Sequence, residues 1–215
     1  MSIVNPALDD YLVEHSSPAD PVLRDLAEET ARAFPDQLTM QISHDEGELL
    51  TMLTQLTGAR LAVEVGTFTG YSSICIARGL AADGRLLACD VSEEWTAVAR
   101  RYWERAGLTD RIDLRLAPAA DTLRRLPAEP HVDFAFVDAD KTGYPVYYEE
   151  LVTRLRPGGL MVLDNVLQEG RVVDEAEQGP SVRAVREVND RIVADKRVSC
   201  VMLPLRDGVT LVRRN

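Results

Sequence analysis

Two acids and a lysine interrupt an apolar, β-forming run in the segment FAFVDADK, where Asp138 and Asp140 are followed directly by Lys141. A later run, LMVLDN, ends in the same manner with Asp164 and Asn165. If both runs are neighbouring strands of a parallel sheet, their carboxyl ends bring Asp138, Asp164 and Asn165 together. Three oxygen donors with no His or Cys nearby indicate a hard divalent cation such as Mg²⁺ rather than zinc. Asp138 and Asp140 alone would indicate only a polar strand end.

A glycine-rich turn follows an earlier β-forming run in VEVGTFTGYSS, where Gly66 and Gly70 bracket the turn. The next β-forming run, RLLACD, ends in Asp90. An acid about twenty residues beyond such a turn can accept hydrogen bonds from both hydroxyls of a ribose. An ordinary tight turn and a helix cap are the alternatives for each feature alone, but their order along the chain favours a nucleoside ligand.

The side chains of this turn distinguish between nucleoside ligands. Phe68 occupies the position of the second glycine of a dinucleotide fingerprint, so a pyrophosphate is not expected on the helix that follows. The Glu64 carboxylate would repel phosphate but attract the ammonium group or the sulfonium of S-adenosylmethionine. The turn therefore predicts S-adenosylmethionine as the cofactor.

These motifs need a scaffold that places strand ends side by side. From Leu61 onward, β-rich runs alternate with segments of helical length and period, which predicts an α/β fold whose seven-stranded sheet is mostly parallel, with helices on both faces. The last two runs, RVSCVMLPL and GVTLVRR, are joined by so few residues that they predict a hairpin with the last strand antiparallel. The motif LRPGG at residues 155–159 predicts a turn between a helix and the fifth strand.

The first forty residues are predicted to be helical. Asp20 is a suitable N-cap and Pro21 fits the first helical position. Ser43 and Glu46 match a Ser-x-x-Glu capping box that would open a further helix. We expect a single domain over residues 1–215, in which 1–57 form N-terminal helices that cover the site and 61–215 form the cofactor- and metal-binding core.

Composition limits the classes of partner. The chain has 215 residues and a formal net charge of −11, and an acidic chain lacks the clustered Lys and Arg that nucleic-acid phosphates require. No segment approaches the roughly twenty apolar residues needed to span a bilayer, and the N-terminus lacks a signal-peptide pattern. We therefore expect a soluble cytoplasmic protein with a small-molecule partner, and reduced core thiols at Cys75, Cys89 and Cys200.

Four segments together closely resemble the cation-dependent class I O-methyltransferases of the caffeoyl-CoA and catechol type. They are MQISHDEGELLTMLTQLTGARLAVEVGTFTGYSS, FVDADKTGY, LRPGGLMVLDNVLQEGRVVD and LPLRDGVTLVRR, and the resemblance extends from about Asp20 to the C-terminus. It implies a Rossmann-like class I methyltransferase fold, a homodimer, and S-adenosylmethionine with Mg²⁺ or another divalent cation as cofactors.

The resemblance also implies roles for individual residues. It assigns Asp138, Asp164 and Asn165 to the metal ion, and Lys141 to the base near the acceptor hydroxyl, with Asp138 as the second catalytic residue. Contacts to S-adenosylmethionine are implied for Met40, Ile42, Glu64, Gly66, Thr67, Ser72, Asp90, Ala119 and Asp138.

These assignments predict the acceptor. A divalent cation that binds two adjacent hydroxyls lowers their pKa and fixes their orientation, so we expect a phenolic substrate with vicinal hydroxyls, as in catechol. The same cation is expected to lower the pKa of Lys141 and so provide a neutral amine. A solvated ion pair with Asp140 is the alternative for Lys141, and helix packing is the expected role of Tyr144, Tyr147 and Tyr148.

Two positions depart from the family pattern. Ala117 stands where glycine is frequent, and Glu169 replaces an uncharged amide in a substrate-side loop, where nothing basic is expected to meet the phosphates of a CoA ester. Three other classes remain as alternatives: a nucleotide-sugar transferase with an Asp-x-Asp metal site, a Rossmann oxidoreductase and a non-enzymatic Rossmann-like domain. Glu64 and Phe68 oppose the diphosphate that the first requires, and the second lacks its fingerprint glycine.

Overall fold

Seven strands form one sheet in the order β3-β2-β1-β4-β5-β7-β6 in the computed structural model, which describes residues 5–215. Strand β7 pairs antiparallel with both of its neighbours, whereas the other neighbouring strands are parallel. This confirms the predicted sheet with its reversed last strand. The strands are β1 Leu61–Val65, β2 Arg85–Asp90, β3 Ile112–Leu116, β4 Val132–Val137, β5 Leu155–Asp164, β6 Val198–Leu203 and β7 Val209–Arg214.

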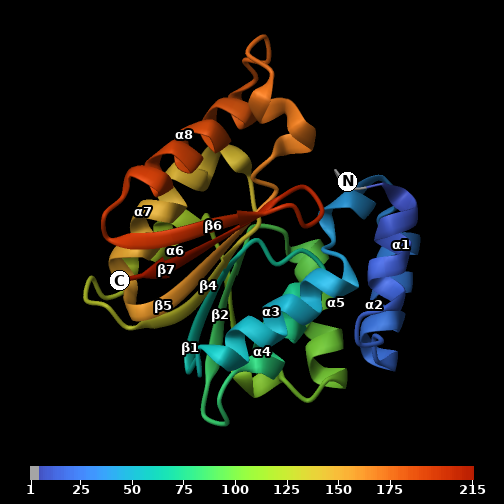
Figure 1. Ribbon diagram of the computed structural model, residues 1–215. Helices are drawn as coiled ribbons and strands as arrows, with labels where there is room; N and C mark the ends of the chain where they lie inside the picture. Colours follow the sequence, from blue (N-terminus) through green and yellow to red (C-terminus); the bar gives the residue numbers. More distant parts are fainter. Residues whose placement is uncertain (1–4) are drawn as a thin grey trace.

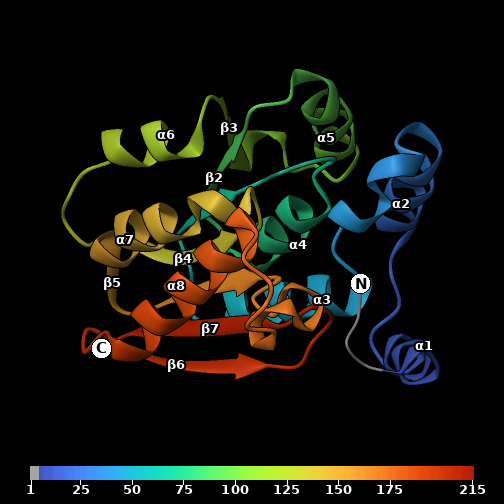
Figure 2. The ribbon, with the colours of Figure 1, turned by 90° about the horizontal axis from the view of Figure 1, so that it is seen from above.

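Helices cover both faces of the sheet, as Figures 1 and 2 show. The central strands β1 and β4 are almost wholly buried, which explains why their sequences are nearly continuous apolar runs. One apolar core contains residues of α3 His44–Leu56, α4 Tyr71–Gly79 and α5 Glu93–Arg105. The opposite core contains residues of α6 Ala119–Arg125, α7 Tyr144–Arg154 and α8 Pro180–Ala194.

The N-terminal part is helical, as predicted. Helices α1 Pro6–Glu14 and α2 Pro21–Ala33 lie beside α3 and α5 at the edge of the molecule, and a 3₁₀ helix, η1 Pro35–Met40, leads from α2 toward α3 (Figures 1 and 2). Asp20 caps α2 as expected, because its Oδ1 atom accepts a hydrogen bond from the Leu23 amide at 3.0 Å. The remaining 3₁₀ helices are η2 Thr109–Arg111, η3 Lys141–Gly143 and η4 Gln168–Val173.

Three local predictions were wrong. Ser43 is the N-cap residue of α3 but its side chain makes no capping hydrogen bond, because the Glu46 side chain of the expected capping box lines a small cavity instead. The LRPGG segment belongs to β5 itself, where Val132 pairs with Leu155 and the register shifts before the next pair, so the extra residues form a bulge rather than a turn. Cys200 is exposed on β6 rather than buried.

The direction of strand order reverses between β1 and β4, which lie at the centre of the sheet. In open parallel sheets, ligands bind at this reversal point, beyond the carboxyl ends of the strands. The glycine-rich turn follows β1 and the Asp138–Lys141 segment follows β4, so the fold places both predicted motifs there. No helix of residues 5–215 is long and apolar enough to cross a membrane.

Candidate active site

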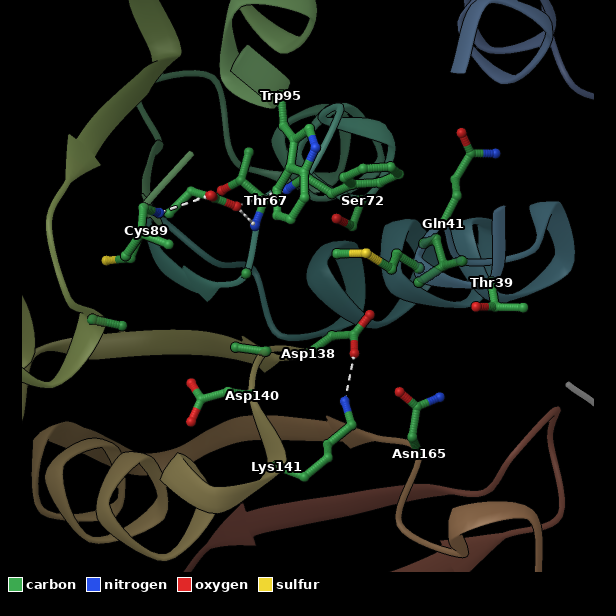
Figure 3. A pocket seen from close by; sticks show the side chains of 18 of the residues that line it. Thr39, Gln41, Thr67, Ser72, Cys89, Trp95, Asp138, Asp140, Lys141 and Asn165 are labelled. Carbon is green, nitrogen blue, oxygen red and sulfur yellow. Dashed lines mark hydrogen bonds and ion pairs between the residues drawn. The ribbon is translucent and has the colours of Figure 1, made fainter. Parts of the chain in front are cut away.

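A cavity of about 640 Å³ opens beyond the carboxyl ends of the central strands. This volume lies within the range of small-molecule sites, about 300–1,000 Å³. Its walls come from the glycine-rich turn after β1, the end of β2, the start of α6, the segment after β4 and the loops after β5 and β6 (Figure 3). Of the predicted cofactor residues, Met40, Ile42, Gly66, Thr67, Ser72, Asp90, Ala119 and Asp138 line this cavity and Glu64 does not.

Gly66 allows the turn after β1 to press against the segment after β4. Its backbone is left-handed, with φ +92°, and a Cβ atom built on it would lie 1.9 Å from the Asp138 carbonyl oxygen. Two features therefore exclude a side chain at this position: the left-handed backbone conformation and the short distance to the Asp138 carbonyl oxygen. The close approach brings the turn and Asp138 to the same wall of the cavity.

Asp90 organises the glycine-rich turn through its carboxylate. One carboxylate oxygen accepts hydrogen bonds from the Thr67 and Phe68 amides, both at 2.9 Å. The other accepts from the Val91 and Ser92 amides at 2.7 and 2.8 Å. The Asp90 side chain is thus not the cap of α5, since Ser92 is the N-cap residue there. Asp90 fixes the shape of the turn and also faces the cavity.

Glu64 lies beneath the turn. The carboxylate is fully buried, and its Oε2 atom accepts hydrogen bonds from the hydroxyls of Ser73 and Thr67. Its Oε1 atom has no hydrogen-bond partner among the described residues. Burial raises the pKa of Glu64 to about 7, although nearby hydroxyls lower it. Glu64 is therefore not part of the cavity wall. It lies behind the lining residues Thr67 and Ser72 and supports the turn through its hydrogen bonds.

An aromatic pair forms the end of the cavity next to Asp90. The Phe68 and Trp95 rings meet edge to face, with centroids 5.2 Å apart, and both side chains line the cavity together with Pro118 and Ala119. This apolar pocket suits the flat base of a nucleoside. We did not predict Trp95, although its position in the first turn after Asp90 was a usable signal.

Lys141 and Asp138 form an ion pair on the opposite wall, with Nζ 2.9 Å from Asp138 Oδ1 (Figure 3). Lys141 Nζ also donates to the Tyr144 hydroxyl at 2.7 Å, and this hydroxyl donates to the Asp164 carbonyl oxygen at 2.8 Å. Burial has the largest single effect on Lys141 and lowers its pKa, but Asp138, Tyr144 and Asp164 together outweigh burial and raise the pKa overall. This direction is opposite to the one expected beside a divalent cation.

The neighbouring acid Asp140 points away from this cluster, as Figure 3 shows. Its Oδ1 atom accepts a hydrogen bond from the Tyr147 hydroxyl at 2.6 Å, and its Oδ2 atom accepts from the Thr142 hydroxyl at 3.0 Å. Asp140 is therefore not the partner of Lys141 that the alternative interpretation required. Nor do Asp138 and Asp140 converge as an Asp-x-Asp metal site would need.

A second, much smaller cavity adjoins the first and contains the predicted metal ligands. Asp138, Asp164 and Asn165 line it together with Glu46 and Arg206, and Asp138 and Asn165 line both cavities. Burial, followed by the charge of Asp138, raises the pKa of Asp164 to about 7. The pKa of Glu46 is also raised, by burial first and then by the charges of Asp164 and Asp138.

The donor chemistry of this small cavity fits a hard divalent cation. Two carboxylates and one amide offer oxygen ligands, which Mg²⁺ and Ca²⁺ prefer. Buried side-chain oxygens at Gln41 and Glu46 have no hydrogen-bond partner within residues 5–215. No three His, Cys, Asp or Glu side chains of that part of the chain are grouped to hold a metal, so a cation bound here would also need the Asn165 oxygen.

The loops after β5 and β6 form one side of the large cavity. Gln168, Glu169, Arg171 and Asp207 line it, and Glu169 stands in the predicted substrate-side loop. Arg171, two residues further on, contradicts the expectation that nothing basic is present there. Asp207 Oδ1 accepts a hydrogen bond from the Glu169 amide, which joins the two loops.

Comparisons with known proteins identify the family of the chain. A profile of the O-methyltransferase family matches residues 13–215. A probable caffeoyl-CoA O-methyltransferase of Dictyostelium discoideum is 38% identical over 214 residues, which cover 98% of this chain and 93% of that protein. The catechol O-methyltransferase domain-containing protein 1 of Mus musculus is 38% identical over 204 residues, or 94% of this chain and 77% of that protein.

Solved structures of similar proteins include two with bound nucleosides. The O-methyltransferase of Bacillus cereus, in complex with SAH, superposes with a TM-score of 0.88 at 35% identity and covers 97% of each chain. TomG of Streptomyces achromogenes, in complex with SAM, superposes with a TM-score of 0.89 at 30% identity, covering 97% of this chain and 96% of that one.

Proposed function

The chain belongs to the O-methyltransferase family, and from this premise we propose that it transfers a methyl group from S-adenosylmethionine to one hydroxyl of a vicinal dihydroxy aromatic, with a divalent metal ion. The observation that carries the proposal is the continuity of one cavity. A nucleoside-sized pocket at Phe68 and Trp95 leads directly to the Asp138–Lys141 ion pair and Asn165. The residues assigned to the cofactor, other than Glu64, therefore share one cavity with Lys141 and with two of the three assigned metal ligands, Asp138 and Asn165.

The cofactor end of the cavity is held rigid by the chain itself. Asp90 fixes the turn after β1 through four backbone amides, and would receive the ribose hydroxyls at the same carboxylate. Phe68, Trp95 and Ala119 would enclose the adenine base. Ser72, at the start of α4, lines the same cavity and would meet the amino-acid part of the nucleoside.

The acceptor end would hold the two aromatic hydroxyls beside oxygen ligands. Asp138, Asp164 and Asn165 would hold the cation. S-adenosylmethionine supplies a methyl group already activated on a sulfonium, and a divalent cation lowers the pKa of a hydroxyl that it binds. The walls of the cavity keep the reacting oxygen and the methyl donor close, which removes much of the entropic cost of the reaction.

Lys141 would accept the acceptor's proton at its Nζ atom. Asp138 is the main charge that raises the pKa of this amine, against the effect of burial. A positive charge bound at Asp138 would cancel that contribution, and burial would then favour the neutral amine. Tyr144 limits the movement of Lys141 because its buried hydroxyl bridges Nζ and the backbone after β5.

The proposal is tested by methyl transfer from labelled S-adenosylmethionine to a catechol, with Mg²⁺ and after exhaustive chelation. Lys141→Ala should lower kcat by about 10²–10⁴-fold, the usual contribution of a general base, with a nearly unchanged acceptor KM. Lys196→Ala, at the chain's other lysine, is the matched control because that residue is exposed. Full activity after chelation, or full activity of Lys141→Ala, would refute the assigned roles.

We also expect a homodimer. Helix α1 exposes Leu8, Tyr11, Leu12 and Val13, each by more than two fifths of its surface, and a contiguous apolar helix face of this kind is typical of an interaction surface. Light scattering at micromolar concentration should give the mass of two chains. A monomer mass would contradict the expectation.

A further inference from the structure

Glu46 is a buried acid that neither the fold nor the proposed roles above explain. It lies in the first turn of α3 and is only 2% exposed. Its Oε1 atom has no hydrogen-bond partner in the part of the chain that the structure describes. Burying a carboxylate without a partner is costly, so such a group is normally paired or coordinates a cation.

Two ordinary explanations do not account for Glu46. A capping box would pair its carboxylate with the start of α3, but Ser43 makes no side-chain capping bond and its hydroxyl is itself buried without a partner. An ion pair with Arg206 would also explain it, since Arg206 lines the same small cavity. However, the ion pairs found within residues 5–215 include none between these two side chains.

The size of the small cavity limits which species can bind next to Glu46. Its volume is about 10 Å³, on the order of the space for one water-sized sphere. A guest at this position is therefore a single atom or ion, rather than part of an organic ligand. The larger cavity adjoins the small one and shares Asp138 and Asn165 with it.

The charges around the small cavity match a divalent cation. Its lining includes the carboxylates of Asp138, Asp164 and Glu46 and the guanidinium of Arg206. With all four ionised, the formal balance is two negative charges. Without Glu46 the balance would be a single negative charge, too little to neutralise a doubly charged ion.

We propose that Glu46 is a supporting residue of the metal site, whose carboxylate on α3 lies outside the ligand set and adds negative charge beside a hard divalent cation held by Asp138, Asp164 and Asn165. This inference rests on the proposed function, since it needs the cation to bind there. It goes beyond that function because it gives a residue of α3 a role in binding the metal. Glu46 is a positioning and charge-balancing residue and takes no part in proton transfer.

The test is the affinity of the full chain for Mn²⁺ without cofactor or acceptor. Mn²⁺ is a hard cation whose unbound ions are counted by electron paramagnetic resonance, and calorimetry gives an independent Kd. Glu46→Gln keeps the shape of the side chain and removes its charge, and should weaken binding by about 10–100-fold, as loss of a supporting residue usually does. Glu46→Asp, which retains the charge, should recover part of the affinity.

Two further variants make the result decisive. Glu48→Gln removes the same charge from the same helix but lies outside both cavities, and should bind Mn²⁺ like the parent chain. Asp138→Asn reports on the proposed metal site itself and should lose most of the affinity. Thermal unfolding without metal checks that every variant is folded, and Glu46→Gln should be at least as stable as the parent because it removes a buried charge.

The outcomes separate the two claims. If Asp138→Asn weakens Mn²⁺ binding while Glu46→Gln binds like the parent, the role of Glu46 is wrong and the metal site stands. If Asp138→Asn also binds like the parent, the proposed metal site itself is wrong. If Glu48→Gln weakens binding as much as Glu46→Gln, the effect is one of general charge and the specific role of Glu46 is refuted.

Discussion

Replacing Asp90 with alanine should both destabilise the protein and weaken the binding of S-adenosylmethionine. The Asp90 carboxylate accepts hydrogen bonds from four backbone amides, those of Thr67, Phe68, Val91 and Ser92. The amides of Thr67 and Phe68 belong to the turn that lines the cavity. Without the carboxylate, the Thr67 and Phe68 amides of this turn lose their hydrogen-bond acceptor.

The magnitude follows from the donors left behind. A buried donor without a partner costs about 1–3 kcal/mol, and two of the four hydrogen bonds are fully buried. Partial solvation from the cavity reduces this cost, so we expect Asp90→Ala to lower the free energy of unfolding by about 3 kcal/mol. In a chain of this size, such a loss lowers the Tm by about 6–12 °C.

Thermal unfolding of the apoprotein measures this loss, and calorimetry with S-adenosylmethionine and with its demethylated product measures the binding. The Tm of Asp90→Asn should lie between those of the parent and Asp90→Ala. The amide oxygen of asparagine replaces one of the two carboxylate acceptors, but its NH₂ group faces backbone N–H donors. Asp113→Ala is the control, since Asp113 is an exposed acid on β3 whose loss should change stability by no more than about 0.5 kcal/mol. An unchanged Tm in Asp90→Ala would refute the role of Asp90 in holding the turn.

Two further predictions concern the turn after β1 and the acid buried beneath it. Gly66→Ala should destabilise the protein far more than Gly58→Ala, because both glycines have positive φ but only Gly66 meets the Asp138 carbonyl oxygen, at 1.9 Å; equal Tm losses would mean that this contact is unimportant. Burial raises the pKa of Glu64 from 4.5 to about 7. Because the pKa of Glu64 is higher in the folded chain than in the unfolded chain, the free energy of unfolding is highest below pH 4.5 and falls as the pH rises through about 7. The shift corresponds to a loss of about 3 kcal/mol. Glu64→Gln should therefore gain stability over the parent between pH 5 and 8, and parallel pH profiles of unfolding would contradict this.

The sheet and its ligand-binding edge could be predicted from the sequence because they follow from short-range patterns. Alternating β-rich and helical segments specify the parallel sheet, and the short link before Val209 specifies the reversed last strand. Asp138, Asp164 and Asn165 were grouped correctly because strand ends meet at one edge of a parallel sheet. No knowledge of side-chain direction was needed for these steps.

Predictions from the sequence failed for residues whose role depends on the direction of the side chain. Glu46 fits a capping box by spacing, yet its side chain lines the small cavity instead. Glu64 stands before the glycine-rich turn but is buried beneath it. Arg206 is more than sixty positions beyond the β4 motif, and the turn between β6 and β7 brings it to the same cavity. Contacts of this kind depend on tertiary packing, which local patterns do not encode.

The most direct test of the proposed reaction compares a catechol with its monohydroxy analogue as acceptors of labelled methyl groups from S-adenosylmethionine. With Mg²⁺ present, the catechol should gain one methyl group on one hydroxyl at a far higher kcat/KM than the monophenol, because two adjacent oxygens are needed to bind beside Asp138, Asp164 and Asn165. After chelation, transfer to the catechol should cease. Equal rates on both acceptors, or transfer to the catechol that survives chelation, would contradict the proposal that a metal ion holds the acceptor.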